Sequence, residues 1–326
     1  MCQAAPLPRR RADDSPNRAL CGGLVPENIL VVQRELVLDS GLRVTLDGRP
    51  PQGSRHEVVF GVLVESGEAV AVKLEGVVGA LGREGCALEY LTARKGPVPQ
   101  LKAAGMVTMS GRRIACLVVE RKEGQAPVSR DGWRRMGRAL GCLGEPVSGV
   151  TQLPALSLER FGAEHARRVR ELGDRLESIA AEVPDWPSLA SADVPRPGPL
   201  VLTHGDPGPG NFLDDGREGW LIDWEDVHVA PRGLDLARAA FIAWLGSGSA
   251  GFVGHDHQAR AQGVVTGYLQ TVPDGWRPTV EETRWWLAVA GTQFIHHRWQ
   301  RGGRPGPWEE AAAVLERCLA HAHPTP

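Results

Sequence analysis

The chain has 326 residues, and its 37 Lys and Arg residues nearly balance 39 Asp and Glu, for a formal net charge of −2. That balance gives no electrostatic reason to expect binding to nucleic acid or to an anionic membrane. No stretch of the sequence is long and apolar enough to cross a bilayer, and Arg9-Arg10-Arg11 is not followed by the apolar run of a secretory signal. The length suffices for one large domain or for two lobes that each bury a core.

The six cysteines are scattered along the chain and form no Cys-x-x-Cys pair. This spacing argues against a metal centre built from thiolates and against a disulfide framework. A reducing compartment fits such a cysteine pattern better than an oxidising one. We therefore expect a cytoplasmic protein.

Residues 1–21 are polar, with prolines and three consecutive arginines, so we predict a flexible tail there. The part that follows, up to residue 121, is typical of a β-rich unit, because alternating apolar residues and short apolar runs indicate strands. One stretch within it has helical character and ends at Lys95-Gly96-Pro97. The predicted elements are strands at 42–46, 58–64, 69–74 and 113–120 and a helix at 81–93.

From residue 122 onward the pattern indicates helices, since apolar residues such as Met136, Leu140 and Leu143 recur at helical spacing. Prolines cluster between residues 184 and 199, which predicts an irregular linker before the short apolar strand Leu200-Val201-Leu202. The remaining helices are predicted at 165–179, 234–245, 281–300 and 308–321.

Two short motifs in the second half carry the chemistry. His204-Gly205-Asp206 is followed by Asn211, and Ile222-Asp223-Trp224 ends an apolar stretch downstream. The prolines and glycines at 207–210 keep Asp206 in an extended loop, where its carboxylate is free. One carboxylate that accepts or orients the proton of a hydroxyl, with an Asn and an Asp as oxygen ligands for Mg²⁺, is the layout of a phosphoryl-transfer site.

These motifs resemble the aminoglycoside phosphotransferase and choline kinase-like superfamily. The resemblance implies an α+β, bilobal, protein-kinase-like fold, with a β-rich N-lobe over 22–121 and a mainly helical C-lobe over 122–326. It also implies Mg²⁺ as cofactor, ATP or GTP as co-substrate, and a small-molecule hydroxyl as acceptor. By the same resemblance, Asp206 is the catalytic residue, and Asn211 and Asp223 are the metal ligands.

The resemblance extends to the nucleotide side. Ala69-Val70-Ala71-Val72-Lys73 is similar to the strand whose Lys faces the phosphates, and Glu84 stands where the superfamily has a Glu that holds this Lys. Glu89, about one helical turn further on, is the alternative partner. At the nucleotide base, the position before Gly124 implies a hinge in which backbone groups of Glu120 and Lys122 pair with the ring.

The loop over the phosphates departs from the protein-kinase pattern. Gly53-Ser54-Arg55-His56-Glu57 contains no complete Gly-x-Gly-x-x-Gly set. Ser54 could offer its hydroxyl and its amide to a phosphate, or it could lie in a simple hairpin loop. A second departure is Gly141-Cys142-Leu143-Gly144, where the superfamily tends to place a His. Asp235 matches a position that braces the catalytic loop, and we interpret it as structural.

The acceptor side is expected in the helices after Asp223. Their aromatic and His side chains could stack on a substrate or hydrogen-bond it, although each Trp could equally belong to the core. The candidate substrate residues are Trp224, Trp285, His297 and Trp299.

The surroundings of these candidates are only mildly acidic, because several arginines accompany the few acids of residues 281–304. Unpaired charges in a closed cleft are costly, so a polycationic aminoglycoside fits poorly. We predict a neutral or weakly charged hydroxylated antibiotic, of nucleoside or macrolide type, as the acceptor. The alternatives are a metabolic kinase for choline, a sugar amine or homoserine, and a non-catalytic nucleotide-binding module. The sequence implies neither a nucleic-acid nor a membrane partner.

Overall fold

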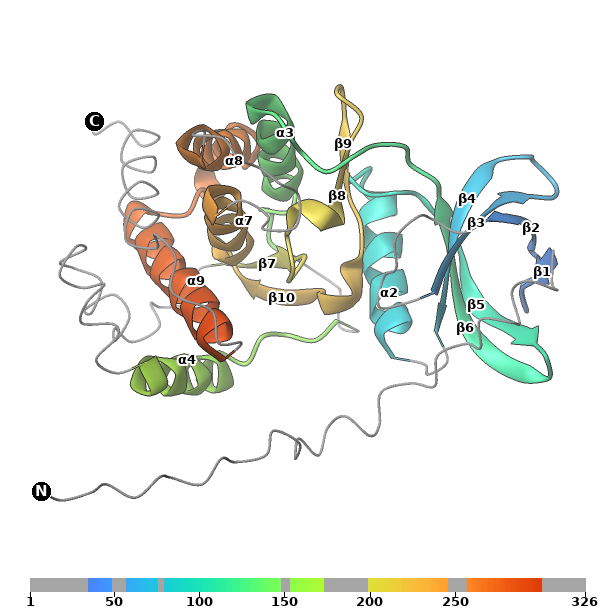
Figure 1. Cartoon of the computed structure of the whole chain (residues 1–326), viewed down its shortest axis with the longest axis horizontal. Coiled ribbons are helices and arrows are strands. Elements are labelled where there is room, and N and C mark those ends of the chain that lie inside the picture. Colours follow the sequence, from blue (N-terminus) through green and yellow to red (C-terminus); the bar gives the residue numbers. More distant parts are fainter. Residues whose placement is uncertain are drawn as a thin grey trace, which may run out of the picture.

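The structure, a computed structural model, describes residues 35–48, 57–75, 79–147, 153–172, 199–245 and 257–300. A β-rich region lies at one end of the molecule and a group of helices at the other, with two short antiparallel strand pairs between them (Figure 1). The strands are β1 (Glu35–Val37), β2 (Arg43–Gly48), β3 (Glu57–Leu63), β4 (Ala69–Glu75), β5 (Leu101–Met109), β6 (Arg112–Glu120), β7 (Leu200–Thr203), β8 (Phe212–Asp214), β9 (Gly219–Leu221) and β10 (His228–Pro231). The helices are α2 (Ala80–Ala93), α3 (Arg130–Gly141), α4 (Leu158–Leu172), α7 (Leu234–Leu245), α8 (His257–Thr271) and α9 (Val280–Gln300).

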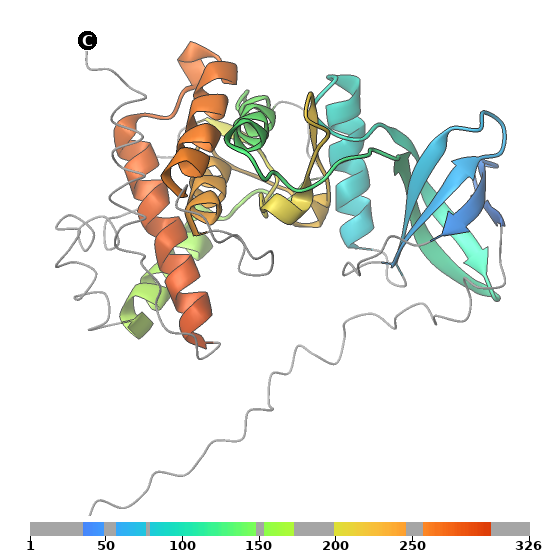
Figure 2. The same cartoon turned by 45° about the horizontal axis from the view of Figure 1, so that its top comes forward.

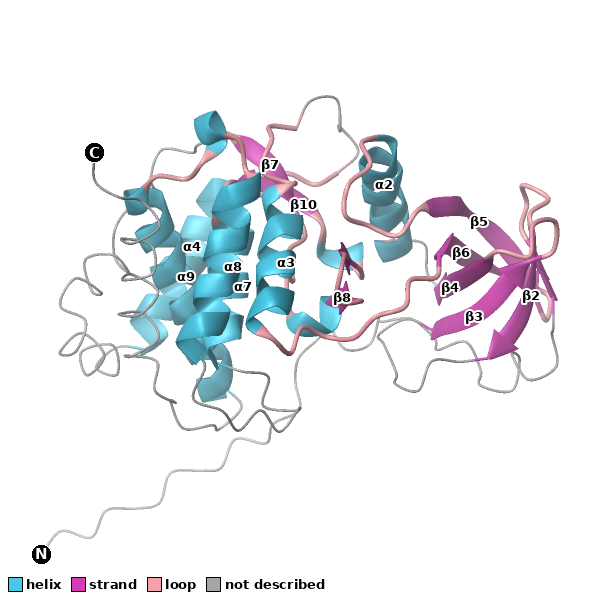
Figure 3. Cartoon of the chain, turned by 90° about the horizontal axis from the view of Figure 1, so that it is seen from above, coloured by secondary structure: helices cyan, strands magenta, loops and turns pink. Residues whose placement is uncertain are grey.

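The first six strands form one antiparallel sheet in the order β1-β2-β3-β4-β6-β5 (Figure 3). On the central strand β4, Val70, Val72 and Leu74 are buried in a core on one face. Side chains alternate across a strand, so Ala71 and Lys73 belong to the opposite face, where Ala71 packs against the core that includes helix α2. The pleat of β4 thus presents the Lys73 side chain to α2.

The predicted strands of this sheet are present, but β1 and β5 were not predicted. β5 runs through Leu-Lys-Ala-Ala-Gly-Met-Val-Thr-Met and pairs with β6 along most of its length. Its sequence is poor in β-branched and aromatic residues, so local propensity gives little sign of a strand. The pairing with the strongly apolar β6 determines its conformation.

Two short antiparallel pairs, β7 with β10 and β8 with β9, connect the sheet region to the helices. In the second pair Phe212 lies opposite Leu221, and the Ile222 amide donates to the Asn211 carbonyl at 3.0 Å. This register brings the residue before β8 and the residues after β9 side by side. Asn211 and Asp223, twelve positions apart in the chain, therefore lie at the same end of one hairpin.

The helical region contains a close contact between α3 and α8. A Cβ atom added at Gly137 would lie 2.0 Å from the Val264 carbonyl oxygen, and one added at Gly267 would lie 2.0 Å from the Arg134 carbonyl oxygen. The two backbones therefore touch without side chains between them. Gly141 makes the same kind of approach, to the Tyr268 carbonyl at 2.7 Å. Close packing explains the glycines in the segment that departs from the superfamily pattern.

The glycines of this contact also explain why α8 was not predicted from the sequence. Gly263 and Gly267 lower the helix propensity of a segment whose polar and apolar residues show little periodicity. Farther from the sheet, α4 lies beside α9 at the opposite end of the molecule (Figures 1 and 2). In the described ranges, no helix is long and apolar enough to cross a membrane. The predicted tail at 1–21 and helix at 308–321 lie outside the described residues.

We predict that Gly137→Ala lowers the free energy of unfolding by about 1–3 kcal/mol, because the new methyl group forces α3 away from α8. Urea denaturation followed by circular dichroism measures this change. Gly82→Ala is the matched control: it lies in α2 with nothing within 4 Å of the added Cβ. It should raise stability by up to about 1 kcal/mol, the difference in helix propensity. Equal effects of the two substitutions would contradict the close contact.

Candidate functional site

Asp206 lies in the loop that follows β7, and its side chain is exposed. The residue before it, Gly205, has φ +88°, and a Cβ there would lie 2.1 Å from the Asp226 carbonyl oxygen. Both the backbone conformation and the lack of space require glycine at this position. The His-Gly-Asp motif is therefore a turn that places the Asp206 carboxylate outside any regular element, as the sequence predicted.

Two side chains of helix α7 hold this loop in place. The Asp235 carboxylate accepts hydrogen bonds from the His204 amide at 2.5 Å and from the Gly205 amide at 3.2 Å. Arg238, one turn later on the same helix, donates to the Gly205 carbonyl at 2.5 Å. The two side chains together satisfy both polar groups of the Gly205 backbone, so the loop is fixed in position.

His204 is fully buried and connects the loop to the second motif. Its Nε2 lies 2.8 Å from the Ile222 carbonyl oxygen, and its Nδ1 accepts from the Asp206 amide at 3.4 Å. The ring also packs against Trp224, with centroids 4.6 Å apart. His204 thus acts as a structural link between the two motifs.

Asn211 lies next to Asp206, and Asp223 lies at the same end of the β8–β9 hairpin as Asn211. The Asn211 amide nitrogen donates to the Asp206 carbonyl at 2.9 Å and to its Oδ2 at 3.1 Å. These two bonds use the nitrogen and leave the amide oxygen as the group that can bind a cation. Asp223 follows β9 with φ 65° and ψ 65°, a left-handed conformation that Asp tolerates better than most residues.

Lys73 connects the sheet to this site. Its Nζ donates to Glu84 at 2.7 and 3.0 Å and to Asp223 Oδ1 at 2.8 Å. Glu84 is 2% exposed, and its Oε1 also accepts from the Trp224 amide at 3.3 Å. The structure therefore contains the predicted Lys73–Glu84 pair, whereas the alternative partner Glu89 is exposed. Burial lowers the pKa of Lys73, but Glu84 and Asp223 more than offset this, so that the pKa lies above its ordinary value.

The donor set of Asn211 and Asp223 fits a hard divalent cation. Both supply oxygen, and Mg²⁺ in proteins is commonly held by one or two such side chains together with phosphates and water. The Lys73 ammonium already lies against Asp223, so this position accommodates positive charge. Over the described residues, no group of three or more His, Cys, Asp or Glu side chains could hold a metal ion by itself.

The hinge candidates follow β6. The Glu120 amide donates to the Gln100 carbonyl at 2.8 Å, so its carbonyl is the backbone group that a base could use. The side chains of Glu120 and Lys122 form an ion pair at 2.5 Å, and the Lys122 Nζ lies 4.7 Å from the Trp220 ring centre. Ser54, the candidate for the phosphate loop, lies outside the described residues.

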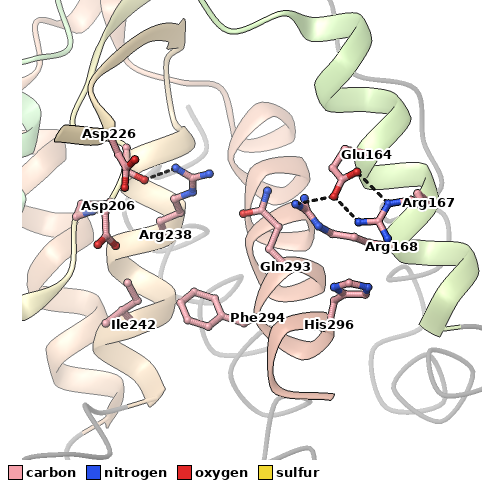
Figure 4. Close-up of a pocket in the computed structure, with 12 residues that line it drawn as sticks. Glu164, Arg167, Arg168, Asp206, Asp226, Arg238, Ile242, Gln293, Phe294 and His296 are labelled. Atoms are coloured by element: carbon pink, nitrogen blue, oxygen red, sulfur yellow. Dashed lines mark hydrogen bonds and ion pairs between the residues drawn. The ribbon is translucent and has the colours of Figure 1, made fainter. Parts of the chain in front are cut away.

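A pocket of about 460 Å³ opens beside Asp206 (Figure 4). Asp206, Asp226 and Arg238 lie on one side of it, α4 forms the opposite wall, and α9 lies between them. The lining residues are Glu164, Arg167, Arg168, Gly205, Asp206, Pro207, Asp226, Arg238, Ile242, Gln293, Phe294 and His296. A space of this size suits a small organic molecule.

Two of the predicted substrate residues are corrected by the structure. Trp224 is 0% exposed and Trp285 is 3% exposed, so neither offers a face to a substrate. Both are core residues: Trp224 packs on His204, and Trp285 packs on Trp286. The side chains of His297 and Trp299, the other two candidates, lie outside the described part of the structure.

The pocket instead uses residues that sequence reasoning did not select. Phe294 supplies the aromatic surface, and the charges come from α4 and α7. One signal was available for Arg238, because it follows Asp235 by three positions and so shares a face of the same helix. Glu164, Arg167 and Arg168 had no comparable signal, since nothing local relates α4 to the catalytic loop.

The model of the phosphotransferase enzyme family matches residues 74–278, more than half of the chain. The chain belongs to this family, and it is an enzyme that transfers a phosphoryl group to a hydroxyl of a small molecule. No curated protein matches it in sequence.

Solved structures resemble the chain in fold. Macrolide 2'-phosphotransferase MphH of Brachybacterium faecium is 19% identical with a TM-score of 0.53, over 87% of this chain and 95% of that one. An aminoglycoside phosphotransferase of Alicyclobacillus acidocaldarius is 16% identical with a TM-score of 0.51, over 92% and 96%. Amicoumacin kinase hAmiN, in complex with AMP-PNP, Ca²⁺ and Ami, is 13% identical with a TM-score of 0.52, over 85% and 90%. The α+β kinase-like fold predicted from the sequence is confirmed.

We predict that Asp235→Asn lowers the free energy of unfolding by about 1–3 kcal/mol, because an amide nitrogen replaces one of the two acceptors that the loop amides need. Chemical denaturation measures the loss. Asp274→Asn, at a highly exposed side chain, is the matched control and should change stability little. If Asp235→Asn had the same denaturation midpoint as wild type, Asp235 of α7 would not be stabilising the loop.

Proposed function

We propose that the protein transfers the γ-phosphoryl group of ATP or GTP, with Mg²⁺, to a hydroxyl of a small molecule. The observation that carries this proposal is the linked set of Asp206 with Asn211 and of Asp223 with Lys73, joined through the β8–β9 hairpin, with Asp206 in the wall of the pocket. These residues come from the sheet, the catalytic loop and the β8–β9 hairpin. We place the boundary between the β-rich N-lobe and the helical C-lobe between residues 121 and 122.

Each residue has a separate role in the proposed reaction. Asp206 faces the pocket, where it accepts or orients the proton of the attacking hydroxyl. Asn211 and Asp223 would hold Mg²⁺, which would neutralise phosphate charge and keep the triphosphate aligned. Lys73 binds the phosphates, and Glu84 keeps its ammonium in place through two hydrogen bonds. Asn211 also fixes the Asp206 carboxylate by donating to Oδ2.

On the nucleotide side, Glu120 and Lys122 follow β6 as the proposed hinge, and the Glu120 carbonyl and Lys122 amide pair with the base. A carbonyl and an amide can pair with N6–H and N1 of adenine or, with the ring shifted in its plane, with N1–H and O6 of guanine, so ATP and GTP both fit this arrangement. The AMP-PNP in the hAmiN complex, a structure of similar fold, supports a nucleoside triphosphate as the donor. Ser54 is proposed to cap the phosphates.

The charges of the pocket support a neutral or weakly charged acceptor. Its wall contains three arginines, Arg167, Arg168 and Arg238, against the three acids Glu164, Asp206 and Asp226. A polycationic aminoglycoside would place several ammonium groups near these guanidinium groups, and unpaired like charges in a partly closed site are costly. We therefore propose a hydroxylated antibiotic of nucleoside or macrolide type as the acceptor, with Phe294 as its apolar contact.

We predict that Asp206→Asn retains nucleotide binding but loses turnover by roughly a hundredfold or more, the usual effect of removing a general base or orienting group. The acceptor is first identified from a gain of about 80 Da, one phosphoryl group, in mass spectra of an antibiotic panel. Turnover is then measured with that acceptor. Asp215→Asn, an exposed substitution on the neighbouring turn, is the control. A wild-type rate for Asp206→Asn would remove Asp206 from its proposed role.

For the acceptor class, we predict higher kcat/KM with nucleoside or macrolide compounds than with kanamycin-like compounds at equal ionic strength. The reason is the repulsion between ammonium groups and the arginines of the pocket wall. Efficient turnover of the polycationic compounds alone would contradict the proposed acceptor class while leaving the kinase activity in place.

A further inference from the structure

The end of the pocket remote from Asp206 contains a guanidinium group that is only partly paired. Arg168 extends from α4, and its one ion pair among the described residues is with Glu164 Oε1 at 3.1 Å. The same Glu164 oxygen is bonded by Arg167, whose guanidinium also pairs with Glu171. One carboxylate is thus shared by two cations. Most of the five N–H groups of Arg168 are not engaged by Glu164.

Arg168 also lies near two other arginines, Arg167 and Arg238, as well as near the acids Glu164 and Glu171. Its side chain is 23% exposed, so that water screens it only in part. Burial lowers the pKa of the Arg168 guanidinium; Glu164 raises it, and the charges of Arg167 and Arg238 lower it again. A negative group bound at this position would relieve both the desolvation of Arg168 and its repulsion by the neighbouring arginines.

Two further polar side chains reach the same space. Arg168 points from α4 toward Gln293 of α9, and Arg238 of α7 lies on the other side of Gln293 (Figure 4). Within the described part of the chain, no hydrogen bond engages the Gln293 amide. Arg168 and Gln293 therefore offer donors from two helices to one part of the pocket, whereas Arg238 donates to the Gly205 carbonyl and lies near Asp206 and Asp226. Asp206 and Asp226 lie on the Arg238 side, away from Arg168.

We propose that Arg168, with Gln293, binds an anionic group of the acceptor, a carboxylate or a phosphate. This inference rests on the proposed function, because it treats the pocket beside Asp206 as the acceptor site. A guanidinium group matches either anion with two parallel hydrogen bonds. Within the proposed weakly charged class, this selects hydroxylated compounds that carry one acidic group at the end of the molecule opposite the phosphorylated hydroxyl, and it excludes neutral acceptors and macrolides without such a group.

The first arm of the test measures anion binding without any acceptor. Sodium phosphate, and separately sodium acetate, is titrated into the full chain at an ionic strength held constant with sodium chloride, and the thermal midpoint is followed. Binding to the folded state raises the midpoint. We expect a smaller rise for Arg168→Gln than for wild type. Arg277→Gln, outside the pocket and half-exposed, is the matched control and should behave as wild type. Phosphate bound near Lys73 would raise the thermal midpoints of wild type and Arg168→Gln equally. The contribution of Arg168 is therefore the difference between their two midpoint shifts.

The second arm compares the turnover of a hydroxylated acid with that of its methyl ester. It is done once with a carboxylic acid and its ester and once with a phosphate and its ester, so that the two anions are told apart. Wild type should favour the acid in kcat/KM by about tenfold, the scale of one charge-assisted hydrogen bond. Arg168→Gln should lose most of that preference. If this variant does not fold, Arg168→Lys retains the charge but not the two parallel bonds, and its preference should fall partway.

Two outcomes would overturn the proposal: equal midpoint shifts for wild type and Arg168→Gln, or equal turnover of acid and ester by wild type. Failure of the proposed kinase function looks different, because no acceptor at all would be phosphorylated. In that case the anion titration still decides whether Arg168 binds a negative group.

Discussion

The site depends on one largely buried cation between two carboxylates. Lys73 of the sheet pairs with Glu84 of α2 and with Asp223 of the β8–β9 hairpin, at 2.7 and 2.8 Å. Glu84 is almost fully buried, so the loss of Lys73 would leave a carboxylate without a counter-charge in a medium where water does not compensate. Because Glu84 also accepts from the Trp224 amide, the same charges fix the Asp223 side chain and the backbone that follows it.

The positions of the other site residues depend on the ion pairs of Lys73. The pairing of β8 with β9 fixes Asn211 relative to Asp223, and the Asn211 amide donates a hydrogen bond to the Asp206 carboxylate. From the other side, Asp235 and Arg238 of α7 hold the Gly205 backbone. The Asp206 carboxylate is therefore positioned from the sheet and from the helical region at once. A reaction that needs its groups in line benefits from such rigid positioning more than from strong basicity.

Much of this arrangement was predictable from the sequence, because it is encoded in short, local patterns. The order Lys73, Asp206, Asn211 and Asp223 led to the family, helix-like stretches indicated α7 and α9, and apolar patterning gave most of the sheet. The failures share a physical cause. Strand β5 and helix α8 take their structure from long-range pairing and packing, through an unremarkable strand sequence and through glycines that let two backbones touch.

The pocket wall was the least predictable part. Trp224 and Trp285 suggested a substrate surface by composition, but their size and apolar character placed them in the core. Arg168 and Gln293 come from helices more than a hundred residues apart, and no local pattern relates them. The packing of the helices determines which side chains line a cavity. This packing cannot be read from a single sequence.

The central claim is that Asp223, held by Lys73, is the cation ligand of a nucleotide site. Calorimetric titration of AMP-PNP, with and without Mg²⁺, into wild type, Asp223→Ala and Asp226→Ala tests it most directly. Asp226 is an exposed acid three residues from Asp223 and serves as the matched control. The account predicts that Mg²⁺ strengthens binding to wild type and to Asp226→Ala but not to Asp223→Ala, because Asn211 alone does not hold the cation. Wild-type Mg²⁺ dependence in Asp223→Ala would contradict it.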